Sequence, residues 1–214
     1  MRRFLAIVMP LILAAFPVSA GFRDGVIAYQ REDYRTAMRE LQPFLNRNDI
    51  PAQTNVPALY YIGMMKLRGL GTTKNRTFGT IYLKMAGLGG HAGAQFALGK
   101  MYYFSIDAPR YYSEAAKWFE RAARQGVVGA QANLGEMYFQ GRGVPTNDVL
   151  AYMWTSIAAA GGSEIAAKYL NTIKRRMSPA QAAKAHKMVA EWKPTKEKYR
   201  KYKKFRMWLS KPQK

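Results

Sequence analysis

Residues able to do chemistry are few and scattered in this 214-residue chain. The two histidines, His91 and His186, lie far apart in the sequence, and there is no cysteine. A zinc or di-metal centre needs clustered Cys, His, Asp or Glu ligands, and no such cluster is visible. Nucleophilic catalysis is also unsupported, because Ser105 and Ser113 have no histidine nearby and no G-x-S-x-G elbow occurs. The sequence therefore predicts no enzyme activity, no metal and no cofactor.

Two glycine-rich segments, Gly69-Leu70-Gly71 and Gly141-Arg142-Gly143, have some likeness to phosphate-binding loops. Such a loop needs a strand before it, a helix after it, and a third glycine or a Gly-Lys-Ser/Thr ending. Both segments lack these features. We interpret them as turns between helices and expect no nucleotide to bind there.

The composition restricts how the fold can be held together and which partners suit it. The chain carries 34 Lys and Arg against 13 Asp and Glu, a formal net charge of +21. Since cysteine is absent, no disulfide can brace the fold, which must be held by packing alone. An excess of positive charge of this size favours association with anionic surfaces.

The stretch from Ala94 to Gly162 contains one sequence pattern twice, 36 residues apart. Nine residues recur in a single ungapped register, which composition alone would not produce. The pattern extends more weakly to Ala58 on one side and Leu170 on the other. The chain is therefore predicted to be a repeat protein. The recurring pairs are Ala94/Ala130, Leu98/Leu134, Gly99/Gly135, Tyr102/Tyr138, Ala115/Ala151, Trp118/Trp154, Ala122/Ala158, Ala123/Ala159 and Gly126/Gly162.

Each repeat has the spacing of a helical hairpin. In the copy that starts at Ala130, apolar residues recur on one side of a short helix. A second helical stretch contains Trp154, and the Gly-Arg-Gly-Val-Pro segment 141–145 between the two cannot be helical. A single hairpin buries too little surface to be stable, so the hairpins must stack on one another. The predicted fold is all-α, an α-solenoid of stacked helical hairpins.

Glycine recurs inside the first helix of each hairpin, at Gly63, Gly99 and Gly135. A glycine in a helix interior costs about 1 kcal/mol relative to alanine. Because glycine recurs at this position of the repeat despite its cost, a stabilising interaction must offset that cost. We expect this interaction to be a close approach of two helices.

The repeated pattern resembles the Sel1-like repeats, which are relatives of the tetratricopeptide repeats. The match is closest at 130–162, which has the form A-x-x-x-L-G-x-x-Y-x-x-G-x-G-V-P followed by A-x-x-W-x-x-x-A-A-x-x-G. It is weaker in the two preceding copies, where the loop glycines or the tryptophan are replaced. The resemblance covers roughly residues 58–175. It implies the hairpin solenoid and a non-enzymatic scaffold or adaptor.

Residues 1–20 have the features of a secretory signal peptide. Arg2 and Arg3 precede an apolar run that ends at Val18, and small residues follow for cleavage before Gly21. The alternative is a membrane anchor, but this run falls short of the roughly 20 apolar residues that a spanning helix needs. We therefore expect a periplasmic or secreted protein with no transmembrane segment after cleavage.

Capping hairpins are predicted at both ends of the array. Near the N-terminus, Asp33 is placed to cap the second helix of an opening hairpin. After the repeats, Ser178-Pro179-Ala180-Gln181 has the sequence of a capping box, which starts a closing helix that runs to about Trp192. The predicted division is a signal peptide 1–20, an N-terminal capping hairpin and linker 21–57, Sel1-like repeats 58–93, 94–129 and 130–165, C-terminal capping helices 166–192, and a basic aromatic tail 193–214.

The first helix of each hairpin is predicted to form a binding face. In tetratricopeptide-like stacks this helix lines the concave surface, so the resemblance places aromatic and basic side chains there. Aromatic residues and arginine dominate the binding energy at many interfaces. Packing of Tyr103 and Phe104 between neighbouring helices is an equally compatible alternative. The predicted partner-binding residues are Tyr60, Met64, Arg68, Phe96, Lys100, Tyr103, Phe104, Phe139 and Gln140.

The composition changes abruptly at Lys193. From there to Lys214, ten basic residues face the single acid Glu197, a net charge of +9. As a helix from Lys196 to Leu209, the tail would place its aromatic residues along one side, as in segments that lie on anionic membranes. Single-stranded nucleic acid would suit the same composition but is not expected for an exported protein, and a solvated tail is the third alternative. The residues predicted to bind an anionic surface are Lys198, Arg200, Lys201, Lys203, Lys204 and Arg206.

The sequence thus predicts a non-enzymatic protein-interaction scaffold or adaptor of the bacterial cell envelope, which holds a protein or peptide in its concave groove. The alternative is a periplasmic or secreted protein whose basic tail binds phospholipid, lipopolysaccharide or a host factor. An enzyme acting on peptidoglycan or a β-lactam is a third class, for which the sequence offers no catalytic residues.

Overall fold

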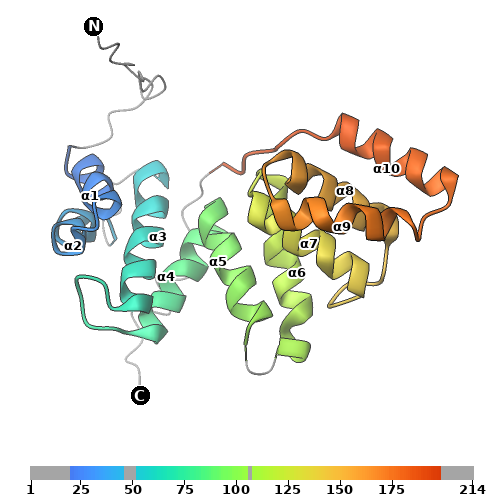
Figure 1. Cartoon of the computed structure of the whole chain (residues 1–214). Helices are drawn as coiled ribbons and strands as arrows, with labels where there is room; N and C mark the ends of the chain where they lie inside the picture. Colours follow the sequence, from blue (N-terminus) through green and yellow to red (C-terminus); the bar gives the residue numbers. More distant parts are fainter. Residues whose placement is uncertain (1–19, 46–51, 106–107, 199–214) are drawn as a thin grey trace, which may run out of the picture.

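The computed structural model describes residues 20–45, 52–105 and 108–198, where the regular elements are all helical and no strand occurs (Figure 1). In these ranges ten α-helices and one short 3-10 helix follow in chain order. The all-α fold predicted from the repeat pattern is confirmed. The helices are α1 Ala20–Gln30, α2 Tyr34–Leu41, η1 Gln42–Phe44, α3 Ala52–Arg68, α4 Arg76–Leu88, α5 Ala92–Tyr103, α6 Ala108–Arg124, α7 Val128–Gln140, α8 Asp148–Ala160, α9 Glu164–Lys174 and α10 Pro179–Glu191.

Consecutive helices form hairpins that stack in chain order. α1 pairs with α2, α3 with α4, α5 with α6 and α7 with α8, and each hairpin contacts the next one. α9 and α10 both pack on α8 and close the array. Several first helices also touch one another directly, since α1 contacts α3, α5 contacts α7 and α7 contacts α9. We call the side of the array on which the first helices lie the first-helix face.

Polar side chains hold the N-termini of several helices. Asp33 caps α2, and the Ser178–Gln181 capping box starts α10, both as predicted. Asn75 and Asn147 cap α4 and α8, each accepting a 3.0 Å hydrogen bond from a main-chain N–H three residues further on. Because each cap satisfies a donor that the helix leaves unpaired, these residues fix where the helices begin.

Apolar clusters between neighbouring hairpins form the core. Trp118 and Trp154 are 9% and 6% exposed, so both lie inside the stack as the hairpin model requires. Phe119, next to Trp118, is fully buried and packs with Phe96 and Tyr103 of α5. The aromatic residues of α6 thus pack both within their own hairpin, through Phe119, and against the preceding hairpin, through Trp118.

The recurring helical glycines lie where two helices approach closely, as expected. A Cβ atom at Gly99 would lie 2.5 Å from the Phe119 ring. At Gly63 it would meet the main-chain carbonyl oxygen of Gly79 at 3.2 Å, and at Gly135 the main chain of α8 at 3.1 Å. The absence of a side chain lets the two helices of a hairpin come together, which offsets the cost of glycine in a helix.

We expect Gly99→Ala to lower the free energy of unfolding by about 2 kcal/mol, although alanine is the better helix former. The new methyl group would overlap a ring that is buried and enclosed, so the two helices must separate. Urea denaturation measures the effect. Gly21→Ala in α1 is the control, because a Cβ there would meet only the Glu40 side chain at 3.5 Å. Unchanged or increased stability of Gly99→Ala would contradict the close-approach explanation.

The predicted linker reaches too far along the chain. α3 begins at Ala52, and Pro57 lies inside this helix rather than before it. Proline removes one main-chain hydrogen bond there. Its neighbours Val56 and Ala58 are 1% and 0% exposed, and this packing offsets the lost bond. The preceding segment, 46–51, is outside the described residues.

Candidate functional site

The nine residues predicted to form a partner-binding face lie on or directly after α3, α5 and α7, but they differ in accessibility. Arg68, Lys100, Phe104 and Gln140 are exposed, Tyr60, Phe96 and Phe139 are partly buried, and Met64 and Tyr103 are buried. The face is therefore composed of basic and partly buried aromatic side chains.

Met64 and Tyr103 are corrections to the predicted face. Met64 is 9% exposed and packs in the apolar cluster that joins α3 and α4 to α5 and α6, and Tyr103 is 7% exposed and packs against Phe119. The Tyr103 hydroxyl accepts a 2.8 Å hydrogen bond from Arg142 and donates a 3.4 Å bond to Glu136. Burial raises the pKa of Tyr103. Tyr103 thus ties α5 to α7, whereas its neighbour Phe104 is 69% exposed.

An aromatic ring fills the space between the first helices at two successive junctions. Tyr60 of α3 stacks on His91 at 4.3 Å, and a Cβ on Gly93 would lie 3.3 Å from the Tyr60 ring. Thirty-six residues later, Phe96 of α5 covers Gly129, where a Cβ would lie 2.7 Å from its ring. The same pair, an aromatic residue over a glycine, closes both junctions.

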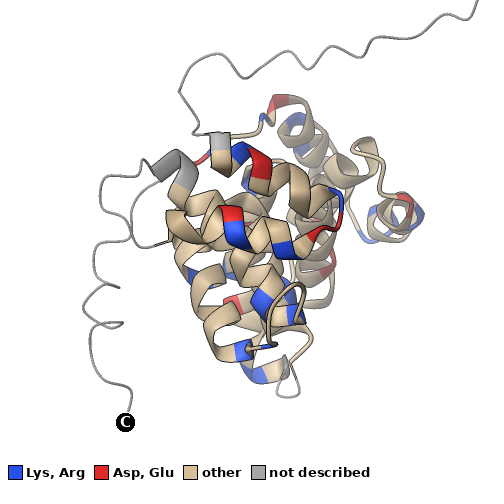
Figure 2. Ribbon diagram, turned by 90° about the vertical axis from the view of Figure 1, so that its left-hand side faces the viewer, with Lys and Arg blue, Asp and Glu red and all other residues tan. Residues whose placement is uncertain are grey.

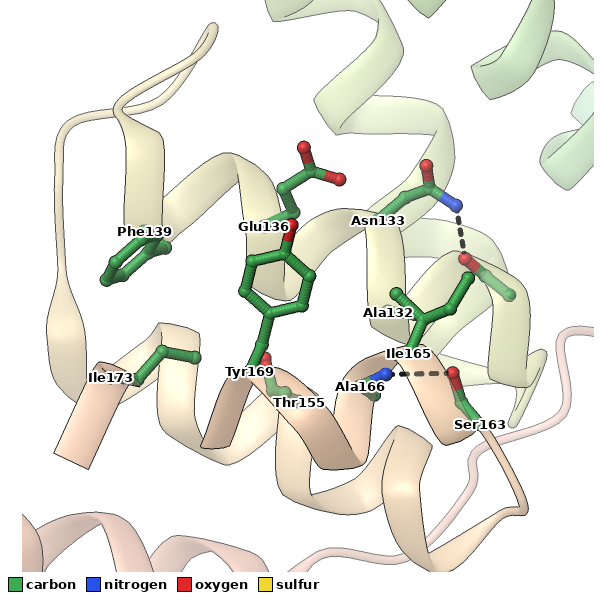
Figure 3. Close-up of a pocket in the computed structure, with 11 residues that line it drawn as sticks. Ala132, Asn133, Glu136, Phe139, Thr155, Ser163, Ile165, Ala166, Tyr169 and Ile173 are labelled. Carbon is green, nitrogen blue, oxygen red and sulfur yellow. Dashed lines mark hydrogen bonds between the residues drawn. The ribbon is translucent and has the colours of Figure 1, made fainter. Parts of the chain in front are cut away.

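The third junction, between α7 and α9, is open. In the 36-residue register, Ala132 replaces Tyr60 and Phe96, so no ring projects from this position of α7. A groove of about 260 Å³ lies there, with the side chains of α7 and α9 on its two sides (Figure 3). Its lining residues are Gly129, Ala132, Asn133, Glu136, Phe139, Thr155, Ser163, Ile165, Ala166, Tyr169 and Ile173.

A second difference between the repeats, in the second helix of the hairpin, also enlarges this groove. The residue of the second helix that meets the recurring glycine is Leu83 in the first repeat and Phe119 in the second, both fully buried. In the third repeat it is Thr155, which lines the groove. Two large side chains of the earlier repeats are thus replaced by small ones at one place.

Both apolar and charged groups lie at the mouth of the groove. Ile165 is 70% and Tyr169 45% exposed, although both are large and apolar. The guanidinium of Arg176 lies 4.4 Å from the centre of the Phe139 ring. The Glu136 carboxylate accepts a 3.1 Å hydrogen bond from Gln140 in addition to its contact with Tyr103. The site can therefore bind a partly apolar group, but it contains no set of residues arranged for catalysis.

His91 has a structural role at the start of α5. Its Nδ1 accepts a 3.2 Å hydrogen bond from the Ala94 N–H, so it caps the helix. Desolvation lowers the pKa of His91 to about 4, and the imidazole is neutral at pH 7. Among the described residues no group of three His, Cys, Asp or Glu could hold a metal ion.

The start of the basic tail is an extended strap, which we define as residues 192–198. It leaves α10 and runs back over the turns between hairpins, with no helix in this segment (Figure 1). The prediction of a helix that begins at Lys196 is therefore wrong for residues 196–198. The remainder of the tail, with Arg200, Lys201, Lys203, Lys204 and Arg206, is outside the described residues.

The strap is held to the array by specific contacts. Glu197 binds Arg121 with two hydrogen bonds of 2.7 and 3.1 Å. The Thr195 N–H donates a 2.8 Å bond to the carbonyl oxygen of Arg124, and the Glu197 N–H donates to the Gln125 side chain at 3.2 Å. At its end, the Lys198 carbonyl lies beside the α4–α5 turn. The one acid of the tail thus anchors it, which sequence reasoning did not foresee.

None of the described helices combines the length and the apolar character needed to cross a membrane. This finding covers residues 20–45, 52–105 and 108–198.

The groove residues Ile165 and Tyr169 were not predicted as part of a site. Ile165 fell at the end of the predicted repeat 130–165 and Tyr169 in the predicted capping helices 166–192, and no binding role was assigned to either segment. The signal was present in the repeat register, where Ala132 and Thr155 stand at positions that carry large side chains in the earlier copies. Comparing the copies for differences, as well as for identities, would have located the groove.

A family model described as the Sel1 repeat matches three consecutive stretches, residues 56–91, 92–127 and 128–163, which make up about half of the chain. These boundaries fall two residues ahead of the repeat boundaries predicted above. A search of curated proteins found no match.

Two solved structures share the architecture. One is a Sel1 repeat protein from Oxalobacter formigenes, with 33% sequence identity, a TM-score of 0.56, and coverage of 64% of this chain and 98% of that one. The other is c5321, a protective antigen of uropathogenic Escherichia coli with an SLR fold, at 22% identity and a TM-score of 0.54. The second match covers 91% of this chain but 49% of the other, so this chain spans about half of that protein and shares its fold.

Proposed function

Because the chain belongs to the Sel1 repeat family, we propose that it is a non-enzymatic scaffold of the bacterial cell envelope whose first-helix face holds a partner protein or peptide. Sel1 repeat proteins are generally protein-interaction scaffolds. The observation that carries the proposal here is the groove between α7 and α9. It exposes Ile165 and Tyr169, and large exposed apolar side chains beside a concavity mark interaction surfaces.

The envelope location rests on the sequence of residues 1–20. A short basic start, an apolar run and small residues before Gly21 support export, so the working protein would be periplasmic or secreted and would begin near α1. An interaction surface without a catalytic set suits an adaptor in that compartment.

A second candidate function is electrostatic attachment through the tail. The strap supports it, because the Glu197–Arg121 pair holds the strap against α6, and ten of the strap and tail residues from Lys193 on are basic. Phospholipid headgroups and lipopolysaccharide phosphates are the anionic surfaces of this compartment. Such binding would weaken as salt increases.

One experiment separates the two functions. Residues 21–214 are used to capture partners from a detergent-solubilised envelope fraction, with the wild type, Ile165→Glu and a chain that ends at Lys198. We expect Ile165→Glu to abolish capture of a defined protein and the shortened chain to retain it. Ending at Lys198 keeps the strap and its contacts with α6, which ending at Trp192 would remove.

Ile27→Glu is the matched control, because Ile27 is also exposed, at 38%, but lies on α1 away from the groove. Capture that survives Ile165→Glu and fails in the shortened chain would support attachment by the tail instead. Equal capture by all four proteins would contradict both functions.

A further inference from the structure

We propose that the groove between α7 and α9 is a socket for one bulky apolar side chain of an acidic peptide. This inference rests on the proposed function and specifies the partner's chemistry. The occupant would take the place that an aromatic residue of the chain itself occupies at the two preceding junctions.

The first step of the argument is the precedent inside the array. Tyr60 and Phe96 each insert a ring between consecutive first helices, over Gly93 and Gly129. The helical hairpins at the third junction are in the same register, but the corresponding residue is Ala132. The backbone therefore offers a ring-sized space that the chain does not fill.

The second step is the size and lining of the space. Its volume of about 260 Å³ lies below the range of about 300–1,000 Å³ typical of small-molecule sites. Its walls are largely apolar, formed by Ala132, Ala166 and Ile173 with the Phe139 ring (Figure 3). A single large side chain suits it better than a cofactor.

The third step is that Ile165 cannot close the groove. It stands at the position of Gly93 and Gly129 in the register, yet it is 70% exposed. Burying the side chains of Ile165 and Tyr169 against a ligand would remove apolar surface from water, which is favourable by roughly 25 cal/mol per Å². The exposed pair thus extends the contact area beyond the socket itself.

The fourth step is the charge around the socket. Arg142 and Arg176 follow the C-terminal ends of α7 and α9, where they pair with Glu136 at 3.8 Å and with Asp148 at 3.1 Å. Lys100 and Arg68 continue the line of exposed cations along α5 and α3, where no salt bridge to a described residue neutralises them. Glu136, the acid in the lining, is engaged by Tyr103 and Gln140. Over the whole chain, Lys and Arg outnumber Asp and Glu by 34 to 13, and Figure 2 shows their distribution at the α1–α2 end of the array. An acidic segment therefore complements the face, whereas a basic one would be repelled.

The test uses a fluorescein-labelled nonapeptide with one central phenylalanine, two acidic residues on each side of it, and glycine or serine elsewhere. Fluorescence anisotropy should show saturable binding to residues 21–214. We expect at least about tenfold weaker binding when alanine replaces the phenylalanine of the peptide. A peptide with lysine in place of the acidic residues should lose at least as much binding affinity.

Ala132→Phe should give the same loss of at least about tenfold, because its ring would fill the socket as Phe96 fills the space over Gly129. Ala183→Phe on the exposed side of α10 is the matched control and should bind the peptide normally. Ile165→Glu is a second variant; the residue is too exposed for its replacement to unfold the array, and it should also weaken binding.

Several results would overturn the inference. The socket is wrong if the wild type does not bind the phenylalanine peptide, or if Ala132→Phe binds it unchanged. The acidic assignment is wrong if the lysine peptide binds as tightly. If a chain that ends at Lys198 binds the peptide more than about tenfold tighter, the chain's own tail is the occupant instead. If the wild type does not bind the phenylalanine peptide but Ile165→Glu still abolishes partner capture, the proposed scaffold function is supported and only the proposed ligand chemistry of the socket is wrong.

Discussion

Phe119→Ala is expected to lower the free energy of unfolding by about 4 kcal/mol, within the range of about 3–5 kcal/mol for removing a buried aromatic side chain. Phe119 is fully buried, its ring fills the space left by Gly99, and it packs with Phe96 and Tyr103. Truncation removes this apolar contact and leaves a cavity at the centre of a hairpin. Urea denaturation followed by far-ultraviolet circular dichroism measures the loss.

Phe104→Ala is the matched control, because the same side chain is removed from a site that is 69% exposed. We expect a change within about 0.5 kcal/mol, as for most surface substitutions. A similar loss in the two variants would mean that Phe119 is not a core residue.

The Phe119 site also connects stability to the candidate binding surface. Its neighbour Phe96 covers Gly129, which lies at the edge of the groove, and Tyr103 bonds Glu136 within it. In a solenoid each repeat is stabilised by its neighbours, so a cavity at one hairpin weakens the next. The position of α7, and with it one wall of the groove, depends on the packing of α5 and α6.

The parts of the fold that could be predicted are those encoded by local repetition. The recurrence of Leu98 and Gly99 at Leu134 and Gly135 indicated the hairpin, and the positions of Asp33 and Ser178 indicated helix starts. These signals act within a few residues of one another, through helix periodicity and capping. Close approach at the glycines followed from the cost of glycine in a helix, and the structure confirms it.

The parts that could not be predicted depend on contacts between distant segments. Glu197 and Arg121 are 76 residues apart, and no pattern in either segment announces their pair. The groove results from small residues, Ala132 and Thr155, and a search for identities passes over them. Met64 and Tyr103 were assigned to an accessible surface because the resemblance places the first helix of each hairpin on the concave side. That placement says little about how deep an individual side chain lies in the stack.

His91 should make the stability of the protein depend on pH below neutrality. It caps α5 through its neutral Nδ1 and stacks on Tyr60, and desolvation lowers its pKa to about 4 from the ordinary 6.5. Between these values the unfolded chain binds a proton at this residue and the folded chain does not. The folded state therefore loses stability as the pH falls from 6.5 toward 4, and the loss is complete below 4.

Between pH 7 and pH 4.5 we expect the wild type to lose about 2.5 kcal/mol more unfolding free energy than His91→Asn, which keeps a capping acceptor but does not titrate. Urea denaturation at the two pH values gives the difference, and comparing proteins removes the contribution of the carboxylates common to both. His186→Asn is the control, because His186 lies exposed on α10, where its Nε2 is 3.1 Å from the Tyr152 hydroxyl. It should follow the wild type. If the unfolding free energy of His91→Asn fell with pH as much as that of the wild type, burial of the neutral His91 imidazole would not explain the sensitivity to acid.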